Sequence, residues 1–359
     1  MEHRVLGGTG VRVSPLTLGA MLFGSTMRTQ GGGKAVNPDG VEFGIRTIHA
    51  AIDAGINIID TADAYAGGES EEVIGRALKG RRDDVLIATK AHVAMGDDPN
   101  MRGNSRRWIT RACEASLRRL DTEFIDIYQM HRPDPVCDVD ETLGVLSDLV
   151  RAGKVRYIGG SGYSGSAIVE AQWVAERRCR ERFVTEQAPY SMLVRGIESD
   201  VLPTCHRYRM GVLAYAPLAH GWLSGRLREP HDDETSVRVG AIRSADANKP
   251  SVQRKLAAAD ALAAVAADVG ASLAQLAVAW SMNHPGVTSV IIGVRNVDQL
   301  TSLLPATDLV LDDAVLDRID EIVTPGTNLD PNDSGDRWLY GKLVPRDVRA
   351  NRRPAVAGR

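Results

Sequence analysis

The chain has 359 residues, of which 43% are hydrophobic and 25% are charged, and its formal net charge is -3. This length allows one large domain or two ordinary ones. The near-neutral charge balance argues against nucleic-acid or membrane-surface partners. No apolar run is long enough to span a bilayer. The start of the chain does not resemble a signal peptide, and four widely spaced cysteines without a C-x-x-C pair predict a cytoplasmic protein with no cysteine-based metal site.

The first predicted element is a β-hairpin. Residues 3–16, HRVLGGTGVRVSPL, contain two short β-like runs around three glycines. The glycines also suggest a phosphate-binding loop, but neither G-x-G-x-x-G nor G-K-[ST] follows them. A turn needs only the positive φ that glycine allows, so the hairpin is the favoured interpretation.

Eight apolar runs then alternate with helical stretches. The predicted strands cover 16–21, 56–60, 85–90, 124–131, 155–161, 183–187, 211–218 and 287–293. The clearest helical patterns cover 41–55, 70–80, 105–120, 139–153 and 165–179. Ser70 is a plausible N-cap for the second of these helices.

This alternation predicts parallel β/α units, and eight units close a (β/α)8 TIM barrel with an N-terminal hairpin and long loops at its C-terminal face. A doubly wound open sheet is the alternative, but the first strand lacks the glycine fingerprint of that fold. We expect one domain over 1–359. Residues 22–40 and 219–250 are polar and rich in glycine or proline, which predicts loops, and 325–359 is expected to be a C-terminal loop and tail.

Four polar residues lie where predicted strands end. Asp60 ends the second strand and Tyr65 follows it, while Lys90 ends the third strand and His131 ends the fourth. Taken singly, Asp60 could cap a turn, Tyr65 could be a packing ring, Lys90 a surface or ion-paired lysine and His131 a satisfied core histidine. Strand ends of a barrel meet at one rim, so together they predict an active site.

These four residues suit proton donation to a substrate oxygen. A free phenol has a pKa of about 10 and donates poorly near neutral pH. A lysine ammonium beside Tyr65 would stabilise the phenolate and lower the pKa of the phenol, and Asp60 would keep Lys90 charged. His131 would orient the substrate carbonyl.

Several blocks resemble the signature segments of the aldo-keto reductase superfamily, and specifically of bacterial NADP-dependent aldo/keto reductases. They are NIIDTADAY, ATK, EASLRRL, FIDIYQMHRPD and AYAPLAHGWLSG, together with the opening VLGGTGVRVSPLTLGAMLFG. The similarity extends from about Leu6 to about Val323. It implies a (β/α)8 barrel that transfers hydride from NADPH to a carbonyl, with Tyr65 as general acid, Lys90 and Asp60 tuning it, and His131 orienting the substrate.

The resemblance also implies a set of residues that contact NADPH. They are Gly19, Met21, Asp60, Ser161, Gln187, Tyr215, Pro217, Leu218, Gly221, Ser224, Gly293, Arg295 and Gln299. Ser161 and Gln187 would bind the carboxamide, Tyr215 would stack on the nicotinamide, and Arg295 would meet the 2′-phosphate or stack on the adenine. The family's asparagine beside Ser161 is Gly162 here, which removes one expected amide contact. The asparagine that contacts adenine near the end of the last block is Leu303, so the resemblance implies a preference for NADPH over NADH rather than a strict requirement.

The predicted function is therefore NADPH-dependent reduction of an aldehyde, ketone or keto-sugar, without a metal. Polar rim loops and the rings of Trp338 and Tyr340 favour an oxygenated substrate. The alternatives are an NADP-binding sensor subunit with little turnover, and a Schiff-base aldolase with Lys90 as nucleophile. The expected partner is a small-molecule carbonyl compound, and a homo-oligomer is compatible with the sequence.

Overall fold

The computed structural model describes residues 1–28, 34–37, 39–226, 242 and 248–334. Eight parallel strands form its centre. They are β3 (Leu16–Gly19), β6 (Ile58–Asp60), β7 (Leu86–Ala91), β8 (Ile125–Met130), β9 (Val155–Ser161), β10 (Phe183–Pro189), β11 (Gly211–Tyr215) and β12 (Ser289–Ile292). They close in the order β10-β11-β12-β3-β6-β7-β8-β9. The predicted barrel is confirmed, and the doubly wound sheet is excluded.

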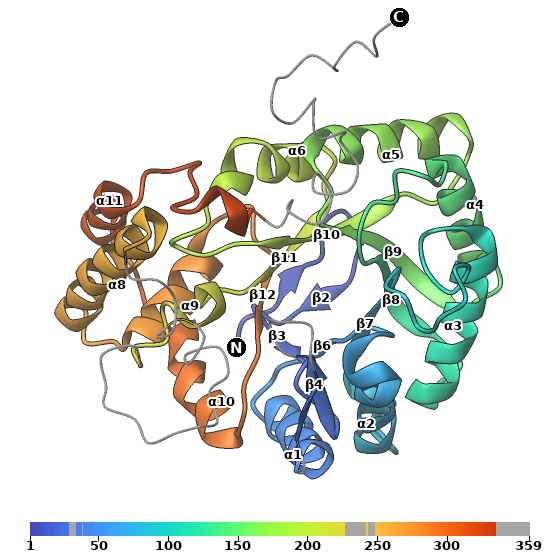
Figure 1. Cartoon of the computed structure of the whole chain (residues 1–359), viewed down its shortest axis with the longest axis horizontal. Helices are drawn as coiled ribbons and strands as arrows, with labels where there is room; N and C mark the ends of the chain where they lie inside the picture. The colour runs from blue at the N-terminus through green and yellow to red at the C-terminus, as the bar shows by residue number, and fades with distance from the viewer. Residues whose placement is uncertain (29–33, 38, 227–241, 243–247, 335–359) are drawn as a thin grey trace, which may run out of the picture.

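Helices surround the barrel (Figure 1). The α-helices among the described residues are α1 (Gly40–Asp53), α2 (Glu69–Ala77), α3 (Arg106–Leu120), α4 (Val139–Arg151), α5 (Gly165–Arg177), α6 (Val201–Arg207), α8 (Pro250–Asp268), α9 (Leu273–Asn283), α10 (Val297–Leu303) and α11 (Asp313–Ile322). Short 3₁₀ turns are η1 (Tyr65–Gly68), η2 (Arg82–Asp84), η3 (Gly196–Ser199), η4 (Ala219–Gly221), η5 (Leu304–Thr307) and η6 (Pro331–Asp333). This outer layer explains the continuous apolar runs, because a parallel strand between barrel interior and helices is buried on both faces.

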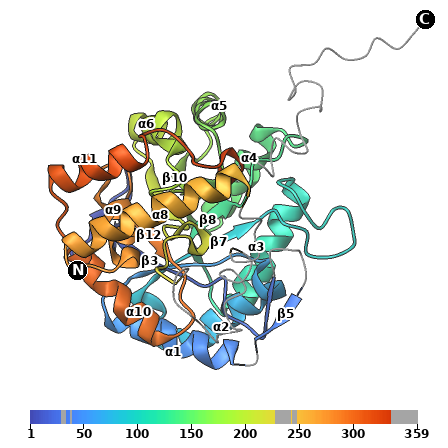
Figure 2. The same ribbon diagram turned by 60° about the vertical axis from the view of Figure 1, so that its left-hand side comes forward.

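Helices α8, α9 and α11 lie together on one side of the barrel (Figure 2). Within the described ranges, no helix is by itself long and apolar enough to cross a membrane. Helices α8 and α9 are long and apolar enough only when they are taken together, and that pair is bent by 88°.

The N-terminal hairpin closes the end of the barrel where the strands begin. Its strands β1 (Arg4–Val5) and β2 (Arg12–Val13) pair antiparallel, and Leu6 packs fully buried against inward-facing strand residues such as Ile127. Gly7 has φ +55°, and a Cβ there would lie 2.5 Å from the backbone nitrogen of Gly211, the first residue of β11. The predicted hairpin is confirmed, and its glycines serve a turn and a close backbone approach.

Two local predictions need correction. Residues 22–40 were expected to be a loop, but Thr26–Arg28 (β4) and Lys34–Val36 (β5) pair as a two-stranded antiparallel sheet. Ser70 is not an N-cap, because α2 begins one residue earlier. Its hydroxyl donates to the carbonyl of Ala20 (2.8 Å) and lies 2.9 Å from the Thr61 hydroxyl, which joins α2 to the barrel.

The other two predicted loops are only partly described. The segment 219–250 contains η4 and the first residue of α8, and most of the remainder lies outside the described residues. The segment 325–359 is described as far as 334, where η6 is its regular element. The predicted tail beyond it, with Trp338 and Tyr340, lies outside the described residues.

Candidate active site

The four predicted catalytic residues meet at one rim of the barrel. Asp60 is the last residue of β6, and Lys90 lies near the end of β7, one strand away in the sheet. His131 directly follows β8, and Tyr65 begins η1 after the β6 strand. Parallel strands bring their carboxyl ends to one face, which is the opposite end from the hairpin. The predicted convergence is therefore present.

Lys90 is the centre of the cluster. Its side chain is fully buried, and its ammonium donates to the Asp60 carboxylate (2.8 Å) and the Thr61 carbonyl (2.7 Å). The ammonium also lies 3.4 Å from the Tyr65 hydroxyl. Burial lowers the pKa of Lys90, but the attraction of Asp60 and Tyr65 outweighs it, so the pKa is raised. Lys90 therefore stays charged. A Schiff-base nucleophile needs a neutral amine, so this environment disfavours the aldolase alternative.

Two opposing effects act on the phenol of Tyr65. Burial raises the pKa of Tyr65, and the Lys90 ammonium opposes that rise without reversing it. The sequence-based expectation of a lowered pKa describes the effect of Lys90 but not the net direction. The correction arises because burial penalises a phenolate more than one ammonium at this distance stabilises it. Tyr65 therefore keeps its proton at neutral pH, which is the state a proton donor needs.

His131 stands beside the phenol. The two rings are edge-to-face with centroids 5.8 Å apart. Burial lowers the pKa of His131 well below its ordinary value, with Lys90 and Arg132 acting in the same direction. The ring is thus neutral near pH 7. Its Nδ1 is buried and has no hydrogen-bond partner among the described residues. A buried ring nitrogen of this kind suits a ligand or water at the site.

The residues expected to bind the carboxamide lie on the neighbouring strands. Gln187, in β10, is buried, and its amide donates to Asp60 Oδ1 (2.7 Å), which links it to the Lys90 cluster. Ser161 ends β9 and is also buried; its hydroxyl accepts from Arg132 (3.3 Å). Gly162 has φ +72° and donates its N–H to the Gln187 carbonyl (3.0 Å). These contacts hold Ser161 and Gln187 at the same rim as the Lys90 cluster.

The segment after β11 has unusual backbone geometry. Tyr215 ends β11 and is half-buried, and three non-glycine residues follow in the left-handed region: Ala216 (φ 56°), Ala219 (φ 46°) and His220 (φ 57°). Such conformations concentrate at functional sites because surrounding structure must offset their strain.

The same segment contains Pro217, Leu218, Gly221 and Ser224, which were expected to wrap the pyrophosphate with backbone N–H groups. Two of these N–H groups already donate within the loop, Gly221 to Leu218 (2.8 Å) and Ser224 to Gly221 (3.2 Å). Pro217 has no backbone N–H to donate. A phosphate would thus have to share these turn hydrogen bonds or replace them.

The expected adenosine side lies around α10 and β3. The backbone N–H of Arg295 donates to Gln299 Oε1 (2.9 Å), so the Gln299 side chain closes the turn that precedes α10. Gly293 follows β12, with open space where a Cβ would stand. Leu303 is buried in the core, so it faces away from solvent where the family's asparagine would be.

Gly19 and Met21 lie at the end of β3. A Cβ on Gly19 would come within 2.9 Å of the Ile291 side chain, so only glycine fits there without movement. Met21 is 41% exposed, so its side chain is accessible to a ligand at this rim. An exposed thioether, a partnerless buried His131 nitrogen and a strained turn on one rim fit a bound nicotinamide nucleotide.

Two contributors were not predicted from the sequence. The backbone carbonyl of Thr61 accepts from Lys90, and Arg132 links the His131 carbonyl (2.8 Å) to Ser161. Arg132 could have been noticed because it directly follows the strand-ending His131. Thr61 carries no comparable signal, because any residue supplies a backbone carbonyl.

The fold and this rim together define a (β/α)8-barrel protein with a hydrogen-bonded cluster of ionisable side chains at the carboxyl ends of its strands. A family model described as "Aldo/keto reductase family" matches residues 15–324. The chain therefore belongs to the aldo/keto reductase family.

Relatives that are named for different functions are similar to this chain over most of their length. A probable voltage-gated potassium channel subunit beta from Oryza sativa subsp. japonica is 34% identical, covering 90% of this chain and 97% of the relative. The aldo-keto reductase YhdN from Bacillus subtilis (strain 168) is 35% identical, covering 86% and 89%. A versiconal hemiacetal acetate reductase from Aspergillus parasiticus is 31% identical, covering 90% and 98%. The family and the reductase-named relatives support an oxidoreductase.

Proposed function

We propose that the protein reduces an aldehyde, ketone or keto-sugar to an alcohol with NADPH. The observation that carries this proposal is the buried Lys90 ammonium, bound to Asp60 and 3.4 Å from the Tyr65 hydroxyl at the carboxyl rim. The test is carbonyl-dependent oxidation of NADPH by the purified protein. A bound reduced nicotinamide supplies the hydride in this reaction.

Four residues divide the work of carbonyl reduction. Tyr65 donates its proton to the carbonyl oxygen. Lys90 stabilises the phenolate that remains, and Asp60 keeps Lys90 charged and in place. His131, being neutral, hydrogen-bonds the substrate oxygen and orients it toward Tyr65. General acid catalysis of this kind contributes about 10²–10⁴-fold to a rate.

The cofactor would be held by the residues of the neighbouring strands. Ser161 and Gln187 would bind the carboxamide, and Tyr215 would stack on the ring. Arg295, at the turn before α10, would meet the 2′-phosphate, because guanidinium groups suit phosphate oxygens. The remaining proposed contacts are Gly19, Met21, Asp60, Pro217, Leu218, Gly221, Ser224, Gly293 and Gln299.

An oxygenated substrate fits the polar groups beside His131. His92 and Asn104 share a hydrogen bond (2.9 Å), and Asn104 donates to the Arg132 carbonyl (2.9 Å). These hydrogen bonds place polar groups, rather than apolar side chains, close to His131. We expect keto-sugars and hydroxylated aldehydes to be turned over faster than long-chain apolar aldehydes, and a panel of such compounds with NADPH tests this.

A second candidate is an NADP-binding sensor subunit with little turnover. It is favoured by the similarity to the relative from Oryza sativa, which is named a probable voltage-gated potassium channel subunit beta. Tight NADPH binding without loss of NADPH on addition of any carbonyl compound in the panel would support the sensor over the reductase.

We also predict a single domain over 1–359, a cytoplasmic location and a homo-oligomer. Size-exclusion chromatography can test the oligomer, and cell fractionation can test the location.

Replacing Arg295 tests the choice of cofactor. We expect Arg295→Ala to weaken NADPH binding by at least about tenfold, because a hydrogen bond to a charged group contributes about 1.5–3 kcal/mol. Binding of NADH, which lacks the 2′-phosphate, should change much less. Calorimetric titration with both cofactors measures this. Equal affinities for the two cofactors in the native protein, unchanged by the substitution, would refute the assignment.

Gly162 offers a gain-of-affinity prediction. Its φ of +72° is a conformation that asparagine tolerates better than most residues, and the nearest atom to a Cβ would be Arg132 Nη1 at 3.5 Å. Gly162→Asn would restore the amide found in the family at this position. We expect about fivefold tighter NADPH binding, as one net hydrogen bond contributes about 1 kcal/mol. Gly162→Ala is the control; equal affinities of the two variants would contradict the prediction.

A further inference from the structure

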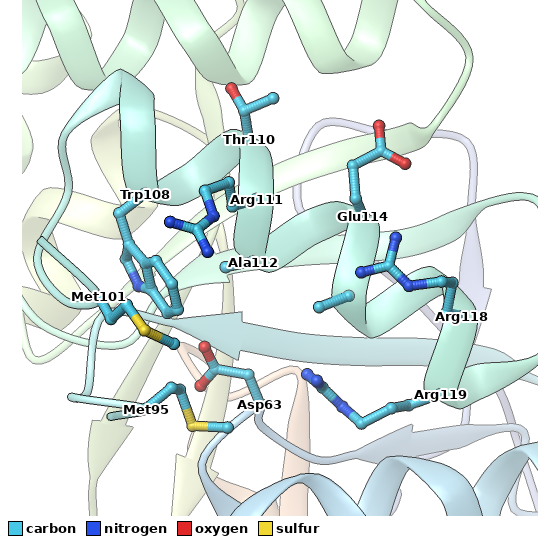
Figure 3. A pocket seen from close by; sticks show the side chains of 11 residues that line it. Asp63, Met95, Met101, Trp108, Thr110, Arg111, Ala112, Glu114, Arg118 and Arg119 are labelled. Carbon is cyan, nitrogen blue, oxygen red and sulfur yellow. The ribbon is translucent and has the colours of Figure 1, made fainter. Parts of the chain in front are cut away.

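A cavity lies beside α3, outside the catalytic cluster. Its volume is about 390 Å³, within the range of small-molecule sites. Figure 3 shows side chains from α3, from the loop before it and from the segment after β6 around this space. The residues that line it include neither Tyr65 nor Lys90, neither His131 nor Asp60. It is therefore a separate site.

Asp63 is the most unusual residue of this cavity. It is 1% exposed, and neither carboxyl oxygen meets a side-chain donor among the described residues; the backbone N–H of Ala64 is the neighbouring group that favours its ionised form. In Figure 3 its carboxyl end points into the space between Trp108 and Arg119. A buried carboxyl without a side-chain partner is costly, so an unfilled site for a polar group is expected at this point.

The apolar part of the lining is aromatic and sulfur-rich. Trp108 is buried, and its Nε1–H is a buried donor without a partner among the described residues. Met95 and Met101, from the loop before α3, contribute thioether side chains to the same wall. Thioethers adapt to flat apolar groups and favour contact with aromatic rings. This wall fits a flat apolar body of a small molecule.

The charged part of the lining is mainly cationic. Arg119 is held by Glu71 (2.7 Å), and Glu114 is held by Lys154. Within the described ranges, Arg111 and Arg118 make no ion pair, although both line the cavity. Two exposed guanidinium groups that make no ion pair within the described ranges favour an anionic group on the ligand.

We propose that this cavity binds a small organic anion with a flat apolar body, such as an aromatic carboxylate. The ring would lie against Trp108, Met95 and Met101, and the anionic group would meet Arg111 and Arg118. The two buried polar groups, Asp63 and the Trp108 indole N–H, would be satisfied by hydrogen bonds to the ligand's oxygens. This site does not depend on the proposed reduction reaction.

The protonation state of Asp63 permits this arrangement. Burial raises the pKa of the Asp63 carboxyl well above its ordinary value, and Glu71 acts in the same direction. The groups that face it are Glu71 from α2, Arg119 from α3, Lys90 from β7 and Tyr128 from β8. A neutral Asp63 donates a hydrogen bond to a carboxylate, whereas an ionised one repels it. Binding of the anion should therefore weaken as pH rises through the raised pKa.

Calorimetric titration with 2-naphthoate tests the site, with 2-naphthylmethylammonium as the cationic counterpart. We expect saturable binding of the anion only. Arg111→Gln and Arg118→Gln should each weaken it by at least about tenfold, as charge-assisted hydrogen bonds imply. Arg107→Gln is the matched control, because Arg107 is an exposed arginine of the same helix that does not line the cavity. The absence of saturable binding would overturn the proposal. Binding that does not change in Arg111→Gln or Arg118→Gln would also overturn it, because that result would place the anion elsewhere, such as at the catalytic cluster.

Asp63→Asn supplies a second, independent readout. Asparagine is neutral at every pH and still donates a hydrogen bond, so the affinity of the variant for 2-naphthoate should not change across a pH series on account of residue 63. The native protein should lose affinity as the pH rises through the raised pKa of Asp63. A native protein whose affinity does not fall, or an Asp63→Asn variant that falls in parallel with it, would remove Asp63 from the site. Because no turnover is measured, failure here and failure of the proposed reductase function are separate results.

Discussion

Tyr65→Phe is expected to lower the rate of carbonyl reduction by about 10²–10⁴-fold, the usual contribution of a positioned general acid. The substitution removes only the hydroxyl that lies 3.4 Å from the Lys90 ammonium. The remaining ring can keep its edge-to-face contact with His131. Stopped-flow measurement of NADPH absorbance under single-turnover conditions isolates this step.

The control for Tyr65→Phe is cofactor binding. NADPH affinity should be nearly unchanged, since the hydroxyl is assigned to the substrate and not to the nucleotide. The native rate should also be flat near neutral pH and fall only at strongly alkaline pH, because burial raises the pKa of the proton donor. Unchanged turnover in the variant would mean that another acid supplies the proton.

Lys90→Met should lower the rate by at least about a hundredfold, and it should also destabilise the fold. Lys90 is fully buried and paired with Asp60, so its removal leaves a carboxylate with the Gln187 amide as its remaining side-chain partner. Breaking a buried ion pair in this way costs about 3–5 kcal/mol. Chemical denaturation measures the loss of stability, and single-turnover kinetics measures the loss of rate.

The double variant Asp60→Asn/Lys90→Met separates the two effects. It removes both charges, so the free energy of unfolding should recover in large part while the rate stays low. If the double variant regained activity together with stability, Lys90 would be structural only. Near-normal activity of Lys90→Met alone would dismiss its role in tuning Tyr65.

The barrel could be predicted from the sequence because its strands leave a simple signal. Each strand is buried on both faces, so runs such as 56–60 and 155–161 are apolar without alternation and end at polar or glycine residues. The β4–β5 sheet gave no such signal. Its strands are three residues each and lie within a glycine-rich segment, which is equally typical of a loop.

The site was predictable where residues end strands, and not where their effect depends on three-dimensional surroundings. Asp60, Lys90 and His131 could be placed on one rim because parallel strands end together. The net pKa of Tyr65 could not be predicted, because it depends on how completely the phenol is buried. Asp63 lies next to the catalytic segment, where an acidic residue is typical of a turn, yet its side chain lines the cavity beside α3.

The most direct test of the account is single-turnover reaction with NADPH carrying deuterium on the transferred position, against a panel of aldehydes, ketones and keto-sugars. The proposed mechanism requires carbonyl-dependent loss of NADPH absorbance, with deuterium appearing on the former carbonyl carbon of the alcohol product. Tight NADPH binding with no deuterium transfer to any compound in the panel would contradict carbonyl reduction and favour the sensor.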